Sequence, residues 1–370
     1  MKDQAQKILN HAGILINGKN PWDIQVHNEK FYSRVFAQGS MGLGDSYVDG
    51  WWDVQALDQF FDKLLRVRLD KKFIRFTFIL NAIKAQIFNL QTKNKARHVV
   101  ESHYDIGNEL YTRMLDKNMQ YTCAYWTGAK NLDAAQIAKL HLICKKLKLK
   151  KGMKVLELGG GYGGLARFMA KVYGCEVVSY NISKEQVAYG RAWCKGLPVT
   201  FIEADYREAK GVYDRVVSIG LCEHIGHKNH RAFMKLAHKC LKDHGLFLLH
   251  TIASNISVTT IDPWIEKYIF QNALIPSAKQ LTAAFEGVFV LEDLHNLGIS
   301  YDHTLMAWHK NFEKTWHELK DTKPVYTERF HRMWRYYLLC SAGSFRSRKN
   351  QLFQIVLSKN GYLGGYESVR

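Results

Sequence analysis

The sequence has little proline, a deficit of acidic residues and no long apolar run. Only 5 of its 370 residues are proline and no low-complexity stretch occurs, so we expect no extended disordered region. No uninterrupted apolar run reaches the ~18 residues that a membrane-spanning helix needs. The first ten residues also lack the apolar core of a signal peptide. Any contact with a membrane is therefore expected at its surface.

The cysteines form no disulfide framework. There are 7 of them, an odd number, and no Cys-X-X-Cys motif occurs. In a chain of this length, scattered cysteines are typical of a reduced, intracellular protein. The length itself fits one large domain with a smaller one.

The charge balance is strongly basic. Lys and Arg number 52 against 34 Asp and Glu, a net charge of +18. Such a surplus favours a polyanionic partner, which is either nucleic acid or the anionic face of a membrane, although it also fits an adaptation for solubility. A nucleic-acid-binding protein should carry its basic residues along a recognised reading element, and we find none. We therefore expect no nucleic acid partner.

Residues 1–90 are predicted to form a mostly helical N-terminal domain. The apolar residues from Leu57 to Leu65 recur at helical spacing. In the next stretch, Phe and Ile alternate with basic residues, namely Lys71, Lys72, Arg75 and Lys84. A basic helix with an aromatic face can rest on a lipid interface, or it can pack on its own domain. The pattern leaves both possibilities open.

Two short segments mark local breaks. Residues 37–47 are rich in glycine, but no strand precedes them and no Lys-Ser/Thr follows, so they predict a turn into a helix rather than a phosphate loop. Residues 91–100 are mainly polar and basic and predict a linker. The remainder, residues 101–370, is expected to be a catalytic domain.

From about residue 133 the pattern alternates between helix and strand. Strands are predicted at Lys154–Leu158, Glu176–Tyr180, Val199–Ala204, Asp214–Ile219, Leu246–Thr251, Phe289–Leu294 and Phe353–Ser358. Helices are predicted at Ala134–Leu147, Gly163–Val172, Lys184–Cys194 and Arg231–Leu241. This order indicates an α/β fold with a doubly wound, mainly parallel sheet, and the two late strands fit an added antiparallel edge.

A glycine cluster predicts a cofactor site. The apolar strand at Val155–Leu158 ends in Gly159, Gly160 and Gly161 and opens a helix. In dinucleotide enzymes such a turn holds a pyrophosphate. Here Glu157 precedes the glycines, and its carboxylate would repel a pyrophosphate. It suits the charged amino-acid end of S-adenosylmethionine.

Further cofactor contacts are expected where the neighbouring strands end, because ligands bind there in open α/β sheets. After the second strand come Asn181, Ile182 and Gln186, and Asn181 stands where an acid usually holds the ribose. After the third strand, Asp205 and Tyr206 can bind and stack on the adenine. Asp205 also suits a simple helix or turn cap.

Several segments resemble the cyclopropane-fatty-acid synthases, the family that includes the mycolic acid cyclopropane synthases. They are SHYDIGNEL (102–110), MQYTCAYW (119–126), GLCEHIGHKN (220–229), LLHTI (248–252), DPWIEKYIF (262–270) and YDHTLMAW (301–308). With the glycine loop they span roughly residues 100–358. The resemblance implies a seven-stranded methyltransferase sheet, S-adenosylmethionine as co-substrate, and Tyr121 and Thr122 as further cofactor contacts.

The resemblance also implies the reaction. A cis double bond of a phospholipid acyl chain attacks the sulfonium methyl, a proton then leaves the resulting carbocation, and a cyclopropane ring closes. The proton acceptor in the family is a bound bicarbonate. Its holders correspond to Cys123, Glu223, His250, the backbone of Ile252 and Tyr301. Phenol, imidazole and backbone N–H groups can donate to an anion, and a carboxylate can accept the bicarbonate O–H.

The expected partners follow from the same resemblance. We expect an unsaturated phospholipid as substrate, an anionic phospholipid membrane surface as docking site, and a homodimer. The expected location is cytoplasmic, at the inner face of the membrane. Two residues depart from the family pattern, because Gly160 replaces a common cysteine and Tyr162 replaces a tryptophan.

Alternative functions remain open. A relative that stops at a methyl-branched lipid, or one that methylates a small molecule, would keep the same glycine loop. His224, His227 and His230 are spaced like metal ligands, but they fall in a strand-to-helix connection, so we expect no metal. Aromatic residues in the last third can line an acyl tunnel or pack in the core.

Overall fold

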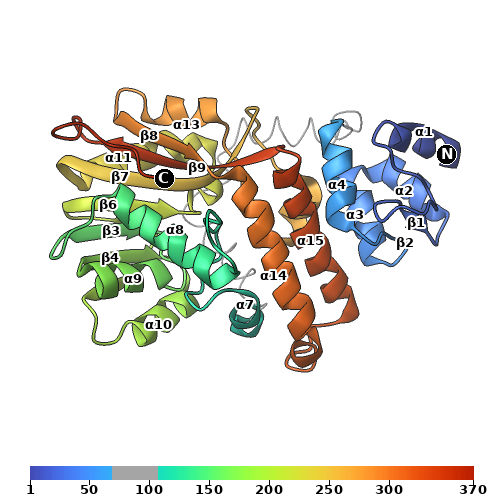
Figure 1. Cartoon of the computed structure of the whole chain (residues 1–370), viewed down its shortest axis with the longest axis horizontal. Coiled ribbons are helices and arrows are strands. Elements are labelled where there is room, and N and C mark those ends of the chain that lie inside the picture. Colours follow the sequence, from blue (N-terminus) through green and yellow to red (C-terminus); the bar gives the residue numbers. More distant parts are fainter. Residues whose placement is uncertain (69–106) are drawn as a thin grey trace.

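The computed structural model describes residues 1–68 and 107–370 (Figure 1). Three sequence predictions lie outside the described residues. They are the basic and aromatic segment after residue 70, the linker at residues 91–100, and the first part of the segment that starts at Ser102.

A seven-stranded sheet forms the centre of the larger part of the molecule. Its strands are β3 (Lys154–Leu158), β4 (Glu176–Asn181), β5 (Val199–Glu203), β6 (Tyr213–Ile219), β7 (Leu241–Ser254), β8 (Val290–Asn296) and β9 (Asn350–Ser358). The order is β5-β4-β3-β6-β7-β9-β8. The first five are parallel, and β9 lies antiparallel between β7 and β8. This confirms the predicted fold class.

Helices cover both faces of the sheet, because consecutive strand residues point to opposite sides. On one face, Val155 and Val217 pack with apolar residues of three helices, namely α8 (Leu132–Lys146), α9 (Gly164–Tyr173) and α10 (Lys184–Trp193). On the other face, Leu156 and Phe247 pack with two helices, namely α11 (His230–Lys239) and α13 (Ala278–Phe285). The predicted helix from Arg231 to Leu241 was two residues too long, since Leu241 already pairs with Tyr213 of β6.

The N-terminal part is helical with one small strand pair. It contains α1 (Lys2–Asn10), β1 (Gln25–Val26), α2 (Lys30–Gln38), α3 (Ser40–Val48), β2 (Trp52–Asp53) and α4 (Leu57–Arg66). In the glycine-rich segment only Gly39 makes the turn, with φ 61°. Gly42 and Gly44 lie inside α3, where the indole of Trp264 leaves no room for a side chain on Gly44.

Two long helices join the N-terminal helices to the sheet. They are α14 (Gly298–Leu319) and α15 (Glu328–Arg346), and Figure 1 shows them between the two parts. Two short helices complete this region, namely α7 (Asn108–Met114) and α12 (Pro263–Tyr268). One hydrophobic cluster runs from the N-terminal helices through α15 to α7 and α14. In residues 1–68 and 107–370, no helix has the length and apolar character to cross a membrane.

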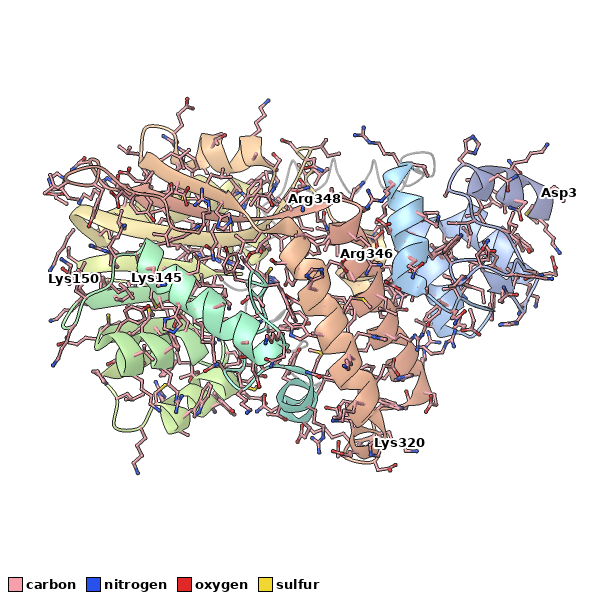
Figure 2. All side chains as sticks on the ribbon, viewed as in Figure 1. Asp3, Lys145, Lys150, Lys320, Arg346 and Arg348 are labelled. Carbon is pink, nitrogen blue, oxygen red and sulfur yellow. The ribbon has the colours of Figure 1, made fainter. Side chains whose placement is uncertain are left out.

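Arg346, which is labelled in Figure 2, ties the two parts together electrostatically. Its guanidinium donates to both carboxylate oxygens of Asp302 on α14, at 2.9 Å each, and to Asp58 on α4 at 2.5 Å. Arg346 on α15 therefore joins α14, on the sheet side, to α4, in the N-terminal part. The planar guanidinium suits this task because it can serve two carboxylates at once.

The contact between α4 and α15 depends on Gly343. A Cβ atom there would lie 2.7 Å from both the carbonyl oxygen of Asp58 and the Cβ of Phe61. We predict that Gly343→Ala lowers the free energy of unfolding by about 1–3 kcal/mol through overpacking. The loss should appear although alanine is the better helix former. Thermal unfolding followed by circular dichroism measures it, and an unchanged or raised midpoint would contradict the packing described here.

Candidate active site

One large cavity, about 1270 Å³ in volume, extends from the glycine loop after β3 to the N-terminal helices. All residues that the sequence analysis singled out as cofactor contacts or anion holders line this cavity. They are Tyr121, Thr122, Cys123, Glu157, Gly159, Gly161, Asn181, Ile182, Gln186, Asp205, Tyr206, Glu223, His250, Ile252 and Tyr301. The strands and loops that carry them are far apart in sequence. The fold brings them to one space.

Glu157 is the last polar group before the glycine turn. Its side chain is buried, and the Ser179 hydroxyl donates to its Oε2 at 2.7 Å. Burial raises the pKa of Glu157 to about 7, while the Ser179 hydrogen bond and the charge of Lys139 act in the opposite direction. A bound cation such as an α-ammonium group would favour the ionised form further.

Lys139 is a member of this site that the sequence analysis missed. It lies on α8, is 0% exposed, and donates to Gln120 Oε1 at 2.6 Å and to Thr122 Oγ1 at 3.0 Å. Because the Thr122 oxygen accepts this bond, its own proton is available to another acceptor. Burial lowers the pKa of Lys139 to about 8. The sequence signal was a lysine on the apolar face of a predicted helix.

Asn181 has little capacity left for a ligand. Its amide nitrogen donates to the Gly161 carbonyl at 2.9 Å and to Gln186 Oε1 at 2.8 Å, and its Oδ1 accepts from the Ser183 backbone. The residue therefore organises the glycine loop. Gln186 accepts with its oxygen, which leaves its amide nitrogen as the donor at this edge of the cavity.

Asp205 and Tyr206 lie at the end of β5. Asp205 caps the following 3₁₀ turn by accepting from the Arg207 backbone at 2.9 Å, and it pairs with the Arg207 guanidinium. The capping role considered from the sequence is therefore present, in a residue that also lines the cavity. The Tyr206 ring is buried against Phe233.

Glu223 lies in the 3₁₀ turn after β6 and is buried beside β7. The backbone N–H of Ile252 donates to its Oε1 at 2.6 Å, whereas Oε2 is buried with no partner in the described part of the chain. Burial raises the pKa of Glu223 to about 7, and the Ile252 hydrogen bond opposes this. The Ile252 N–H is thus engaged by Glu223, and an added anion could only share it.

His250 lies within β7, four residues before the strand ends. It is 1% exposed, and burial together with the charges of Lys139 and Lys146 holds its pKa well below the usual range. The imidazole is therefore neutral. Its Nδ1 lies 3.2 Å from Gln354 Nε2, and its Nε2 is buried without a partner in the described residues.

Cys123 and Tyr301 contribute neutral groups. Burial raises the pKa of the Cys123 thiol, which donates weakly to the Ala124 carbonyl, so no thiolate forms. Burial likewise keeps the pKa of Tyr301 well above its usual value, and its ring packs against Phe345 at 4.5 Å. Neither residue is a nucleophile at neutral pH.

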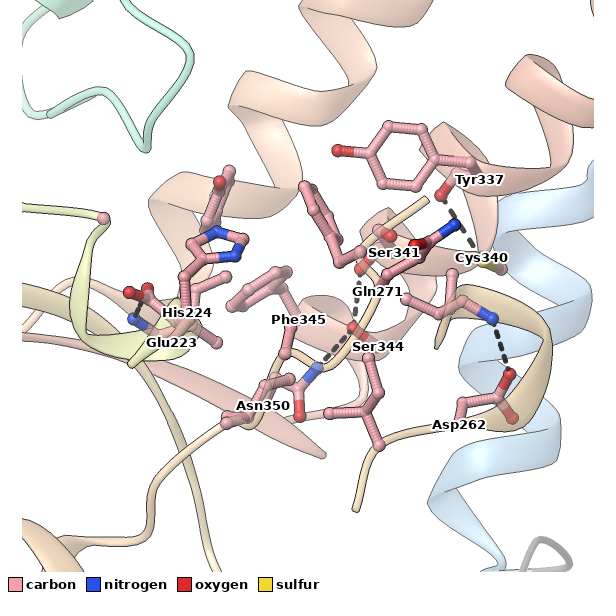
Figure 3. A pocket seen from close by; sticks show the side chains of 18 of the residues that line it. Glu223, His224, Asp262, Gln271, Tyr337, Cys340, Ser341, Ser344, Phe345 and Asn350 are labelled. Carbon is pink, nitrogen blue, oxygen red and sulfur yellow. Dashed lines mark hydrogen bonds between the residues drawn. The ribbon is translucent and has the colours of Figure 1, made fainter. Parts of the chain in front are cut away.

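The opposite wall comes from α15 and its surroundings. Figure 3 shows Glu223 and His224 at one side of the cavity, Tyr337 and Cys340 at the other, and Phe345 and Ser344 between them. Beyond them the lining is mainly apolar and is supplied by the N-terminal helices, namely Ile8 and Leu9 of α1, Phe31 and Val35 of α2, and Phe60, Phe61, Leu64 and Leu65 of α4. A long apolar chain would fit this lining.

The three histidines with metal-like spacing do not share one site. His224 lines the cavity and contacts the Phe270 ring, while His230 begins α11. Within residues 1–68 and 107–370, no group of three or more potential metal ligands is found.

The structure gives a reason for each departure from the family loop. A Cβ on Gly160 would overlap the Ser179 hydroxyl, so the serine occupies the space that a cysteine side chain would need. The Tyr162 hydroxyl donates to Asn108 Oδ1 at 2.9 Å, and its ring packs against Tyr189. It therefore links the glycine loop to α7.

Comparisons with known proteins point in one direction. A family model described as mycolic acid cyclopropane synthetase matches residues 91–355. The chain is 49% identical over 356 residues to the cyclopropane-fatty-acyl-phospholipid synthase of Escherichia coli (strain K12), which covers 96% of this chain and 92% of that protein. It is 32% identical over 280 residues to a probable fatty acid methyltransferase of Pseudomonas putida, covering 72% and 70% of the two chains.

A solved structure agrees with these relatives. The mycolic acid cyclopropane synthase CmaA1 complexed with SAH and CTAB superposes with a TM-score of 0.65 and 27% identity. The match covers 71% of this chain and 98% of that one.

The Ser179 side chain occupies the space that a side chain at position 160 would need. Substitutions at these two positions should therefore have coupled effects on cofactor binding. A Cβ at position 160 would lie 1.9 Å from Ser179 Oγ and 2.8 Å from Glu157 Oε2, so Gly160→Cys must displace the partner of Glu157. We predict about tenfold weaker binding of S-adenosylhomocysteine, which corresponds to about 1.4 kcal/mol and lies within the ~1–3 kcal/mol that overpacking typically costs. Isothermal titration calorimetry measures it.

Ser179→Gly, combined with Gly160→Cys, should restore most of the affinity, and Ser179→Gly alone serves as the control. Native affinity in the Gly160→Cys variant would show that the two side chains do not compete for this space.

Proposed function

This chain belongs to the mycolic acid cyclopropane synthetase family, and on that premise we propose that it transfers a methylene group from S-adenosylmethionine to a cis double bond of an unsaturated phospholipid acyl chain. The observation that carries the proposal is one continuous cavity. It joins a glycine loop preceded by an acid to a buried cluster of Cys123, Glu223, His250 and Tyr301, and continues into an apolar lining.

The glycine-loop end suits the co-substrate. Glu157 offers a carboxylate for the α-ammonium group, and the Thr122 hydroxyl, held by Lys139, offers a donor for the α-carboxylate. Gln186 presents its amide nitrogen to the ribose, and Asp205 and Tyr206 lie where the adenine would be placed. Glu223 and His250 line the same cavity, so they would be available to the methyl group during its transfer.

The apolar end suits the acyl chain. The lining from α1, α2 and α4 can bury a hydrocarbon chain, which gains roughly 0.8 kcal/mol per buried CH₂ group. On this view residues 1–90, whose described part is mostly helical, belong to lipid binding. Residues 101–370 would then form the catalytic domain.

The cluster suits a carbocation because it offers no strong nucleophile. Burial keeps the Cys123 thiol and the Tyr301 phenol protonated, and it keeps the imidazole of His250 neutral. A carbocation in this cavity also requires that the bound substrates displace water from it. The aromatic ring faces of Tyr301 and Phe345 can stabilise positive charge nearby. The carboxylate of Glu223 adds a favourable field.

The cluster also suits a small anion with a proton, such as bicarbonate. Glu223 Oε2 and His250 Nε2 are buried and have no partner in the described residues, so an acceptor and a ring nitrogen are both available. When bound, bicarbonate supplies the base that takes the proton released as the ring closes. Glu223 would accept the bicarbonate O–H, and His250 and Tyr301 would donate to its oxygens.

A methyl-branched product is the alternative outcome. It would follow the same alkylation but would end without ring closure, and one relative is named as a probable fatty acid methyltransferase. We favour the cyclopropane because a relative that is 49% identical over 96% of this chain is a cyclopropane-fatty-acyl-phospholipid synthase.

The proposal predicts a defined product. Incubation with S-adenosylmethionine and vesicles of cis-unsaturated phospholipid should convert olefinic acyl chains into products heavier by one CH₂ unit that contain no double bond. Mass spectrometry and proton NMR of the extracted lipid measure both changes. No mass gain with any unsaturated phospholipid would exclude lipid alkylation, and a gain with a methyl branch would support the alternative.

Glu223→Gln provides the mechanistic arm of this assay. The amide cannot act as the carboxylate acceptor, so turnover should fall at least about 100-fold, while binding of S-adenosylhomocysteine persists. Glu266→Gln is the matched control. It replaces a carboxylate that lies outside the cavity lining, so this variant should retain activity. Because burial raises the pKa of Glu223 to about 7, the acceptor form is lost as pH falls below neutrality, and turnover should fall with it. Unchanged turnover in Glu223→Gln would reject its role.

We also propose that the protein binds the anionic surface of a membrane peripherally and works as a homodimer. The net charge of +18 supports the first point. Sedimentation with anionic vesicles should carry down more protein than sedimentation with neutral vesicles, and the excess should vanish at high salt because screening shortens the range of the attraction. Equal binding to both lipids at every salt concentration would contradict an electrostatic contact.

A further inference from the structure

A row of buried polar side chains crosses the antiparallel edge of the sheet. In the strand register, Gln354 of β9 lies opposite His250 of β7 on one side and opposite His295 of β8 on the other. Directly paired residues project to the same face of a sheet, so the three side chains form one row. Gln354 is 0% exposed and lies in an otherwise apolar stretch of β9.

A cation stands at the outer end of this row. Lys146 of α8 is completely buried, pairs with Asp293 at 3.2 Å, and places its Nζ 3.2 Å from His295 Nδ1. An ammonium group has no lone pair, so His295 Nδ1 must accept and its proton must lie on Nε2. Arg370 also binds Asp293, through two contacts of 2.8 Å, and holds the carboxylate in place.

The positive charge orients the amide between the two rings. Among the described residues the Gln354 carbonyl oxygen is buried without a hydrogen-bond partner, so the field of Lys146 beyond β8 is what favours directing this oxygen toward β8 and the amide nitrogen toward His250. The contact of 3.2 Å between Gln354 Nε2 and His250 Nδ1 has this orientation. A neutral imidazole that accepts at Nδ1 carries its only proton on Nε2.

We propose that Gln354 is a positioning residue that fixes the tautomer of His250, so that the Nε2–H points into the cavity as a hydrogen-bond donor. The inference rests on the proposed function, since the donor is assigned to the oxygens of the bound anion. His250 is then an anion holder rather than a base. The reversed amide would place a lone pair of His250 in the cavity, opposite acceptor oxygens.

The cavity side of the ring calls for a donor. Glu223 Oε2 and His250 Nε2 are both buried and unpartnered within the described residues, and both belong to the cavity lining. An anion placed there presents acceptor oxygens, and Nε2–H is complementary to them. The same N–H gives the ring no lone pair on that side with which to trap a carbocation.

Two substitutions separate the tautomer from simple packing. Gln354→Glu keeps the shape and, at alkaline pH where the buried carboxyl group is ionised, offers only acceptor oxygens, so it should draw the proton to His250 Nδ1 and leave the lone pair on Nε2. Gln354→Met keeps the approximate volume and removes the hydrogen bond. Gln351→Met is the matched control, because Gln351 is a buried glutamine of the same strand whose amide contacts Asn296 instead.

The direct readout is the pair of imidazole nitrogen shifts of His250 in protein labelled with ¹⁵N-histidine. His250→Asn identifies the signals by their loss. The native protein and Gln351→Met should show a protonated Nε2 and an unprotonated Nδ1. The pattern should reverse in Gln354→Glu at alkaline pH and become mixed in Gln354→Met. A protonated Nδ1 in the native protein, or no change in Gln354→Glu at that pH, would overturn the proposal.

Activity gives the second readout. At alkaline pH both Gln354 variants should lower turnover about 10- to 100-fold, as is typical for the loss of a group that orients a ligand-binding histidine. They should also raise the bicarbonate concentration needed for half-maximal rate and leave S-adenosylhomocysteine affinity unchanged. Unaltered turnover and bicarbonate dependence in Gln354→Glu at that pH would contradict the assigned role.

If the native protein shows the expected tautomer but alkylates no lipid, the proposed function fails and the assignment of Gln354 stands. If lipid is alkylated but Nδ1 carries the proton, only the assignment fails.

Discussion

Burial of the polar groups that line one cavity is the constraint on which the rest of this structure depends. Burial raises the pKa of both Glu157 and Glu223 to about 7 and keeps His250 neutral. Groups that would be fully ionised on a surface are therefore close to their switching point. Polar atoms left unpartnered in such a space cost free energy, which a ligand with matching groups would recover.

The architecture supplies this space through its two long helices. Because α14 and α15 stand between the sheet and the N-terminal helices, the cavity starts at the ends of parallel strands and finishes among apolar helices. Close packing at Gly343 and the carboxylate pairs of Arg346 hold these helices together. Polar chemistry and a hydrocarbon site thus occupy one continuous volume. The antiparallel strand β9 adds a row of polar groups behind His250.

Much of the fold followed from the sequence because strands and helices carry their own periodicities. The predicted bounds of β3 match the structure, and the seven strands were found within a few residues, except that β7 is extended by pairing at Leu241. The role of the N-terminal glycines was harder to predict. Gly44 lies within a helix, and only its tertiary contact with Trp264 explains why a glycine is needed at that position.

The site residues that belong to sequence motifs could be predicted. The site residues that are defined by tertiary packing could not. Most of the predicted residues reach the cavity wall because strand ends converge in a parallel sheet, whereas Tyr121, Thr122 and Cys123 come from a loop and Tyr301 comes from α14. Lys139 and Gln354 were missed, as each is a single polar residue in an apolar helix or strand whose partners come from distant segments. The engagement of the Ile252 N–H by Glu223 likewise depends on geometry that no motif encodes.

The central claim is that an alkene is alkylated in this cavity and that a proton is then removed from the new carbon. The most direct measurement uses S-adenosylmethionine with a trideuterated methyl group and cis-unsaturated phospholipid vesicles. The structure predicts a product acyl chain that has gained CD₂, with one deuteron released and no double bond remaining. Acyl chains that retain the whole CD₃ group, or that carry no label, would contradict the claim.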